Sequence, residues 1–179
     1  MKKNIFHQLK EKDIKDVLYI YNYHIEHSIG NFEEKKMSFV SFSKFINSIN
    51  KKKLPFIVSK TNNIISGFAF LSQYRNKSGY RFTFENSIYI HPEFVNKGIG
   101  NQLLKELIKN CKKNKIIKNI IAVIGDSKNY NSIKIHKNNG FIKIGILKKV
   151  GFKKNKWIDS VYMQKKLWEK QIVKFLNRH

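Results

Sequence analysis

Two glycines, Gly98 and Gly100, stand two residues apart just before a segment whose apolar residues recur with helical spacing. The first turn of a helix has free backbone N–H groups and the positive end of the helix dipole, so it can bind an anion such as phosphate. Neither common phosphate loop fits, because Asn101 stands where the Walker loop has lysine and Leu103 where the dinucleotide-binding pattern has its third glycine. The turn alone is therefore either an anion site or an ordinary connection between a strand and a helix.

Glu85 is a candidate general base. It lies in RFTFENSIYI, residues 81–90, which has the composition of a strand. Strand alternation puts Glu85, Ser87 and Tyr89 on one face, and Phe82, Phe84, Ile88 and Ile90 on the other. A carboxylate held among aromatic side chains loses hydration, which raises its pKa toward the range useful for a base. The alternative is a salt bridge at the sheet edge or a solvated face.

His136 is a candidate for proton movement, because imidazole titrates near neutrality. It lies in NSIKIHKNN, residues 131–139, which favours a short helix that ends at Gly140. A lone histidine on a helix can equally be a packing residue. His24 and His27 have helical i, i+3 spacing, but the sequence shows no further ligands beside them, so we expect a surface pair and no metal site.

The elements that must position these residues follow from periodicity and turn signals. We expect strands at 4–10, 55–60, 64–73, 81–90, 118–124, 141–147 and 157–167, and helices at 13–26, around 42–49, after Gly100, and at 131–139. Strands alternate with helices and the chain then finishes with strands. This order predicts one α/β domain with a three-layer mixed sheet.

Length and composition are those of a single domain. The chain has 179 residues and no apolar run of the roughly 18 residues that a membrane span needs, so we expect no membrane partner. The N-terminal residues lack the apolar region of a secretory signal, and the single cysteine, Cys111, excludes an internal disulfide. A cytoplasmic location is the default expectation.

The formal net charge of +24 raises the hypothesis of a basic nucleic-acid-binding protein. The basic residues are 33 lysines and three arginines, and they are spread from end to end. Arginine is the better bidentate reader of phosphates and bases, so a dedicated nucleic-acid binder would not be expected to lack it. A general lysine bias explains the charge more simply, and we expect no specific nucleic-acid partner.

Two motifs together resemble those of the GNAT superfamily of N-acetyltransferases. The turn at 95–100 resembles the acyl-CoA pyrophosphate loop, [QR]-x-x-G-x-[GA], and NYNSIKIHKNNGF, residues 129–141, resembles the second motif of that superfamily. IYNYHIEHS, YRFTFENSIYIHP and GILKKVGFKKNKWIDSVYMQKKL resemble the phosphinothricin acetyltransferase subfamily. The resemblance implies a GNAT-like domain over 1–167, with a mixed, mostly antiparallel twisted sheet and helices on both faces. Residues 168–179 are expected to be a lysine-rich helical tail.

The resemblance also implies roles for the candidate residues. Acetyl-CoA would be the co-substrate, with its pyrophosphate held by the loop of Val95, Asn96, Lys97, Gly98, Ile99 and Gly100. The loop departs from the family pattern, since Val95 stands where a polar residue is usual. The pantetheine arm would contact the backbone of Ile88, Tyr89 and Ile90, and the side chain of Asn129, for which helix capping is the competing use. Glu85 would be the base, and His136 would assist proton movement.

The remaining site residues concern the acceptor. Arg75 and Arg81 flank the strand of Glu85 and could pair with a substrate carboxylate, while Phe32 and Tyr80 could be walls of the substrate site. We therefore expect N-acetylation of a small amino-acid-like amine, such as phosphinothricin or methionine sulfone or sulfoximine, by direct attack. The alternative within the fold is a protein N-terminus, a lysine or a polyamine. The resemblance also makes a homodimer possible.

Overall fold

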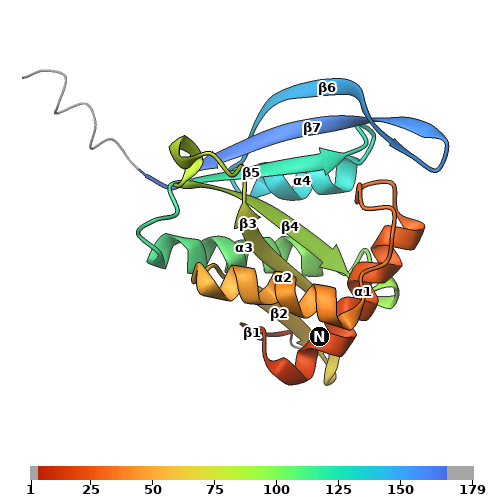
Figure 1. The fold of residues 1–179 in the computed structure, drawn as a ribbon, viewed down its shortest axis with the longest axis vertical. Coiled ribbons are helices and arrows are strands. Elements are labelled where there is room, and N and C mark those ends of the chain that lie inside the picture. The colour runs from red at the N-terminus through yellow and green to blue at the C-terminus, as the bar shows by residue number, and fades with distance from the viewer. Residues whose placement is uncertain (1–3, 169–179) are drawn as a thin grey trace, which may run out of the picture.

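The structure is a computed structural model that describes residues 4–168. Seven strands form one sheet in the order β1-β2-β3-β4-β5-β7-β6 (Figure 1). The strands are β1 (Ile5–Gln8), β2 (Phe56–Thr61), β3 (Ile64–Gln73), β4 (Thr83–Ile90), β5 (Asn119–Gly125), β6 (Ile142–Lys153) and β7 (Lys156–Lys166). All of their pairings are antiparallel except that of β4 with β5. The mixed, mostly antiparallel sheet is confirmed, and the helix expected in the tail lies outside the described residues.

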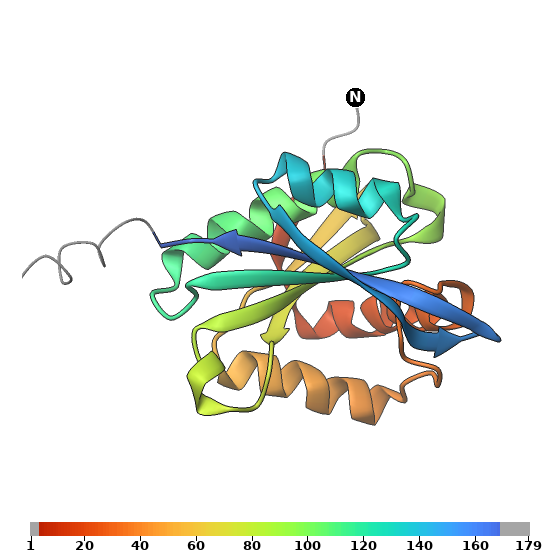
Figure 2. The ribbon, with the colours of Figure 1, turned by 90° about the horizontal axis from the view of Figure 1, so that it is seen from above.

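Within residues 4–168, four α-helices cover the two faces of the sheet, as expected. They are α1 (Ile14–His27), α2 (Phe39–Lys51), α3 (Ile99–Lys113) and α4 (Tyr130–Asn138). Figure 2 shows α1 and α2 on one side of the sheet and α3 and α4 on the other. Short 3-10 helices lie before α1 and on both sides of β4, at Glu11–Asp13, Ser78–Tyr80 and Pro92–Phe94.

The helix that follows the glycine turn is anchored by its apolar stripe. The stripe packs on β2, β3 and β4, and its fully buried members are Leu103, Leu104, Leu107 and Cys111. Burial of each leucine contributes about 1.5–3 kcal/mol, which fixes the start of the helix against the sheet. On the opposite face, the rings of Phe56, Phe68 and Phe70 stack on one another.

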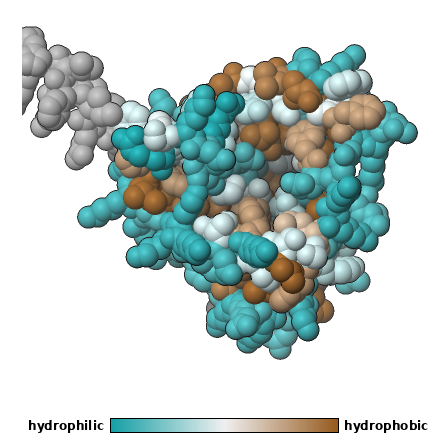
Figure 3. Space-filling model, viewed as in Figure 1, coloured by the Kyte–Doolittle hydropathy of each residue, from teal (hydrophilic) through white to brown (hydrophobic). Residues whose placement is uncertain are grey.

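The β6–β7 hairpin is longer than the sequence indicates. The strand expected at 141–147 extends to Lys153, and the turn is made by Lys154 and Asn155, both with positive φ. Two register shifts interrupt the pairing of β6 with β7. They break the alternation of apolar and polar residues by which a long strand is recognised in a sequence. Exposed apolar side chains along the hairpin are those of Ile142, Ile144, Leu147, Val150, Phe152 and Trp157. Figure 3 shows hydrophobic side chains gathered along the edge where β6 and β7 lie.

The two central strands β4 and β5 separate part of the way along their length. They pair only through Thr83–Glu85 and residues 119–121, and beyond Glu85 each strand bonds only to its outer neighbour, β3 or β7. Figure 1 shows the two strands diverging toward the ends at which they finish. The gap leaves the inner backbone edges of both strands without a sheet partner.

Candidate functional site

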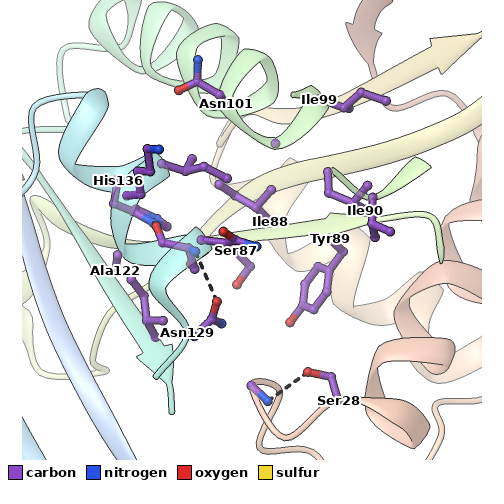
Figure 4. A pocket seen from close by; sticks show the side chains of 18 of the residues that line it. Ser28, Ser87, Ile88, Tyr89, Ile90, Ile99, Asn101, Ala122, Asn129 and His136 are labelled. Carbon is purple, nitrogen blue, oxygen red and sulfur yellow. Dashed lines mark hydrogen bonds between the residues drawn. The ribbon is translucent and has the colours of Figure 1, made fainter. Parts of the chain in front are cut away.

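A cavity of about 610 Å³ occupies the gap between β4 and β5. Its walls come from the α1–α2 loop, the ends of β4 and β5, the loop before α3, and α4 (Figure 4). The predicted site residues that line it are Ile88, Tyr89, Ile90, Val95, Asn96, Gly98, Ile99, Gly100, Asn129 and His136. Both sequence motifs are thus brought to one cavity.

The glycine turn has the conformation that an anion site at a helix start requires. Gly98 has φ 75°, a left-handed conformation that side chains disfavour, and Asn96 also has positive φ. Gly100 lies close to α4, because a Cβ on it would be 3.2 Å from Cδ1 of Ile135. The first N–H groups of α3 have no partner within the helix, so they can bind an anion.

Lys97 is placed differently from the rest of the loop. Its Nζ donates a hydrogen bond of 2.7 Å to the carbonyl of Glu93 and lies 4.9 Å from the centre of the Phe94 ring. Lys97 does not line the cavity. Backbone N–H groups are therefore what the turn offers to an anion.

The backbone edge of β4 that faces the gap is that of Ile88 and Ile90. The N–H of His91 donates to the carbonyl of Ser66 on β3, and backbone groups of a strand alternate in direction, so residues 88 and 90 point toward β5. Their side chains point toward α3, whereas the Tyr89 ring points to the α1 side (Figure 4). The N–H groups of Ile88 and Ile90 and the carbonyl of Ile88 can pair with an extended ligand in the gap.

His24 closes one end of this edge. Its Nε2–H donates to the carbonyl of Ile90 at 2.8 Å, and its ring packs against Tyr89. Burial lowers its pKa, while the hydrogen bond to Ile90 opposes this. The expected surface pair is therefore wrong for His24, although His27 remains exposed and stacks on Tyr23. Among residues 4–168 there is no group of three or more potential metal ligands.

Asn129 uses its side chain as a helix cap. Its Oδ1 accepts a hydrogen bond of 3.2 Å from the Ser132 N–H at the start of α4 (Figure 4). Asn129 also lines the cavity, so its side chain can cap α4 through Oδ1 and still contact a ligand through the amide nitrogen.

His136 is buried at 4% exposure and has both ring nitrogens engaged. Nδ1 lies 2.8 Å from the carbonyl of Ser132, and Nε2 lies 3.0 Å from Nδ2 of Asn86. Burial lowers the pKa of the imidazole, which favours its neutral form. Asn86 was not singled out from the sequence, where it reads as an ordinary polar residue of a strand.

Glu85 lies on the other face of the sheet, with Ser87 and Tyr89 as expected. Burial raises its pKa to about 7, and no ion pair opposes this in the part of the chain that the structure describes. Burial also raises the pKa of Tyr162 on β7, and the charges of Tyr74 and Glu85 raise it further while Arg75 lowers it.

The two arginines are in different settings. The Arg75 guanidinium lies 5.2 Å from the centre of the Tyr74 ring and 5.8 Å from that of Tyr80. Arg81 donates to the carbonyl of Ser78 and lies 4.6 Å from the Phe82 ring centre. The structure thus brings Arg75 and Tyr80 together, while Arg81 is bound to its own turn, and none of the three lines the cavity.

The loop after α1 closes the cavity on the α1 side. Gly30 lies against Gly125, since a Cβ on Gly125 would be 2.8 Å from Cα of Gly30. Lys153 is buried, and its Nζ donates to the carbonyls of Ile25 and Asn31. Phe32 does not line the cavity, because its ring packs over Gly151 on β6.

The chain is similar to known acetyltransferases. The acetyltransferase (GNAT) domain family matches residues 6–162. A phosphinothricin N-acetyltransferase from Alcaligenes faecalis is 35% identical over 159 residues, which cover 89% of this chain and 80% of the relative. An L-methionine sulfoximine/L-methionine sulfone acetyltransferase from Salmonella typhimurium is 29% identical, with 88% and 91% covered. A phosphinothricin acetyltransferase from Sinorhizobium meliloti, solved in complex with AcCoA, has a TM-score of 0.89 and 30% identity, with 94% and 91% covered. Across residues 4–168, no helix is both long and apolar enough to cross a membrane.

Proposed function

The chain belongs to the GNAT family of acetyltransferases, and from that premise we propose that it acetylates the amino group of a small amino-acid-like molecule. Acetyl-CoA is the acyl donor, and the substrate is of the phosphinothricin or methionine sulfone or sulfoximine type. The observation that carries the proposal is the gap between β4 and β5. Its cavity is lined by His136 on the α4 side and by Ser87 and Tyr89 on the face of Glu85, so two reactants can meet through the sheet.

The donor is held on the α3 and α4 side. The turn at Gly98 and the start of α3 bind the pyrophosphate, and the backbone of Ile88 and Ile90 aligns the pantetheine arm along β4. Acetyl-CoA supplies an acyl group activated as a thioester. The αL conformation of Gly98 and the backbone edge of β4 that no strand pairs with support this assignment.

Glu85 acts as the general base on the acceptor side. It takes a proton from the substrate ammonium, the amine nitrogen attacks the thioester carbonyl carbon, and the carbon–sulfur bond breaks. A pKa of about 7 suits this role, because the carboxylate is partly ionised at neutral pH and still basic enough to take the proton. The second N–H proton of the attacking amine goes to the departing thiolate. Assistance by His136 in proton movement is the alternative to a positioning role, which the hydrogen bonds of its two ring nitrogens support. Cys111 is fully buried on α3, away from the cavity lining, so transfer is direct.

Arg75 binds the carboxylate of the acceptor. Its guanidinium stands beside Tyr74 and Tyr80, and the pKa of Tyr162 reflects the charges of both Arg75 and Glu85. A cation at this place disfavours lysine and polyamine substrates, which are the same-fold alternative.

A thiol-release assay tests the proposal. Acetyl-CoA is incubated with amino-acid-like amines, with the matched carboxamides, with a polyamine and with a peptide that has a free N-terminus. We expect acetylation of the carboxylate-bearing amines at the highest kcat/KM. A preference for the polyamine or the peptide would support the alternative, and thiol release no faster than hydrolysis with every amine would contradict the proposal.

We also propose that the protein is a cytoplasmic homodimer. The edge strand β6 has free backbone groups and exposed apolar side chains at Ile142 and Ile144, which a second copy of the chain could cover. Sedimentation of the wild-type protein and of Ile144→Lys tests this: we expect a dimer that the substitution weakens. A wild-type monomer at micromolar concentration would contradict it.

A further inference from the structure

The contact between Asn86 and His136 has a defined direction. The carbonyl of Ser132 can only accept, so Nδ1 of His136 must carry a hydrogen, at a separation of 2.8 Å. In a neutral imidazole the other nitrogen, Nε2, is then an acceptor. Asn86 must therefore donate through Nδ2 across the 3.0 Å contact, and its Oδ1 faces away from His136.

The Oδ1 of Asn86 has no hydrogen-bond partner among the described residues. The residue is 5% exposed, and leaving a buried acceptor unpaired costs about 1–3 kcal/mol. Asn86 also lines the cavity. A ligand that offers a hydrogen there would remove this cost, so the unpaired oxygen indicates the chemistry of what binds beside it.

Asn86 stands where the gap begins. Glu85 and Ile121 are the last paired residues of β4 and β5, and Asn86 is the next residue on β4, on the α4 side of the sheet. The pyrophosphate turn is at the opposite end of the cavity, beyond Ile90. An arm that enters at the turn and extends along β4 therefore brings its sulfur end to Asn86.

From this geometry we infer that Asn86 is a binding residue for the thiol end of the CoA arm, and that His136 is the positioning residue that orients it. Oδ1 accepts a hydrogen bond from a donor at that end, which is either the N–H of the amide nearest the sulfur or the S–H of the product thiol. The chain Ser132–His136–Asn86 holds the acceptor in place. The inference rests on the proposed function, because that function places CoA in this cavity.

The tautomer of His136 gives a direct test on the folded wild-type protein. Nitrogen NMR of ¹⁵N-histidine-labelled protein, with the signal assigned by its loss in His136→Gln, should show a neutral ring protonated at Nδ1. If the ring were protonated at Nε2, that N–H would donate to Oδ1 of Asn86, so Oδ1 would not be unpaired and the inference would be overturned. This measurement needs no substrate and no variant of Asn86.

Binding of CoA to Asn86→Leu gives the second test, with Asn110→Leu on α3 as the matched control outside the cavity. We expect Asn86→Leu to raise the calorimetric Kd of CoA about tenfold, with the acceptor KM nearly unchanged, and the control to leave both at wild-type values. Desulfo-CoA, which lacks the thiol, separates the two donors. If the donor is the amide, Asn86→Leu should lower the affinity for desulfo-CoA as much as it lowers the affinity for CoA. If the donor is the thiol, Asn86→Leu should leave the affinity for desulfo-CoA unchanged. Unchanged CoA affinity in a folded Asn86→Leu protein would overturn the inference.

The assays also separate this inference from the proposed function. CoA binding is measured without any acceptor, so it stays informative if no amine is acetylated. If wild type acetylates amines and Asn86→Leu loses only kcat, with CoA affinity intact, Asn86 is not a binding residue. If His136→Gln loses the acidic or the basic limb of the pH dependence of kcat, proton movement would be assigned to His136 and its positioning role would be overturned.

Discussion

Glu85 and Ile121 form the last pair between β4 and β5, and the cavity begins directly beyond them. Glu85 thus lies at the closed end of the gap, on the face opposite to α3 and α4. A carboxylate at that place is largely buried, and it stands beside the point where the proposed function has the two reactants meet. Both the raised pKa of Glu85 and the cost of ionising it in the folded protein follow from this position.

The pH dependence of turnover should report the ionisation of Glu85. Burial raises its pKa to about 7, and the base must be ionised, so kcat/KM should rise with pH and level off above about 7. Tyr89 and Tyr162 face the carboxylate, and both keep a pKa raised by burial, so they remain protonated in this range. In Glu85→Gln we expect turnover about 10²- to 10⁴-fold lower, with acetyl-CoA affinity nearly intact. A wild-type rate in Glu85→Gln would remove Glu85 from the mechanism.

The same burial should lower stability as pH rises. The folded carboxyl has a pKa of about 7 and the unfolded one about 4.5, so the folded state binds more protons between these values. Its stabilising contribution is complete below pH 4.5 and is lost as pH rises through 7, by at most about 3 kcal/mol. Glu85→Gln removes the charge, so the difference in melting temperature between mutant and wild type should grow in the mutant's favour from pH 5 to pH 8. A difference independent of pH would show that the carboxyl is not buried in solution.

The two arginines should differ in their effect on substrate affinity. Arg75→Lys keeps the charge but loses the planar fork, so the KM of a carboxylate-bearing amine should rise about tenfold. Arg81→Lys is the matched control, because Arg81 is bound to the carbonyl of Ser78. The KM of the matched carboxamide should change little in either variant. Equal effects of both substitutions would refute a specific role for Arg75.

The sequence predicted the fold, and it singled out many residues that line the cavity, because both depend on local signals. The periodicity of β4 separates Glu85 from Ile88 and Ile90, and the regular register of β4 on β3 places them on opposite faces. The apolar stripe of α3 and the glycines before it predicted a helix start at this place, and α3 begins at Ile99. Such patterns repeat within a few residues, so they can be read without tertiary contacts.

Residues that act across the fold could not be read in this way. Asn86 meets His136 across 50 residues, and Lys153 reaches the α1–α2 loop across more than 120. Lysine at 153 is one of 33 in the sequence, and only burial distinguishes it from the rest. The length of β6 was underestimated for a related reason, because its irregular register is set by β7.

The conformation of Gly98 should be needed for donor binding. Its φ of 75° costs an alanine about 1–2 kcal/mol, although no atom would obstruct the added Cβ. Gly98→Ala should therefore raise the Kd of CoA several-fold by reorienting the N–H groups at the start of α3. Gly145→Ala on β6 is the matched control, because that glycine also has open space and lies outside the cavity. Equal CoA affinity in the two variants would exclude the turn from donor binding.

Lys153 should control acceptor affinity through the loop that it holds. Its Nζ donates to the carbonyls of Ile25 and Asn31, and Asn31 lines the cavity. Lys153→Met preserves the length of the side chain but leaves two carbonyls without their donor, which costs about 1–3 kcal/mol and lowers the melting temperature by about 2–4 °C for each kcal/mol. The loosened loop no longer closes the α1 side of the cavity, so the KM of the amine should rise while CoA affinity stays close to wild type. Lys156→Met is the matched control, since Lys156 pairs with Lys153 in the hairpin but is exposed. A fall in stability without a change in the KM of the amine would limit Lys153 to a structural role.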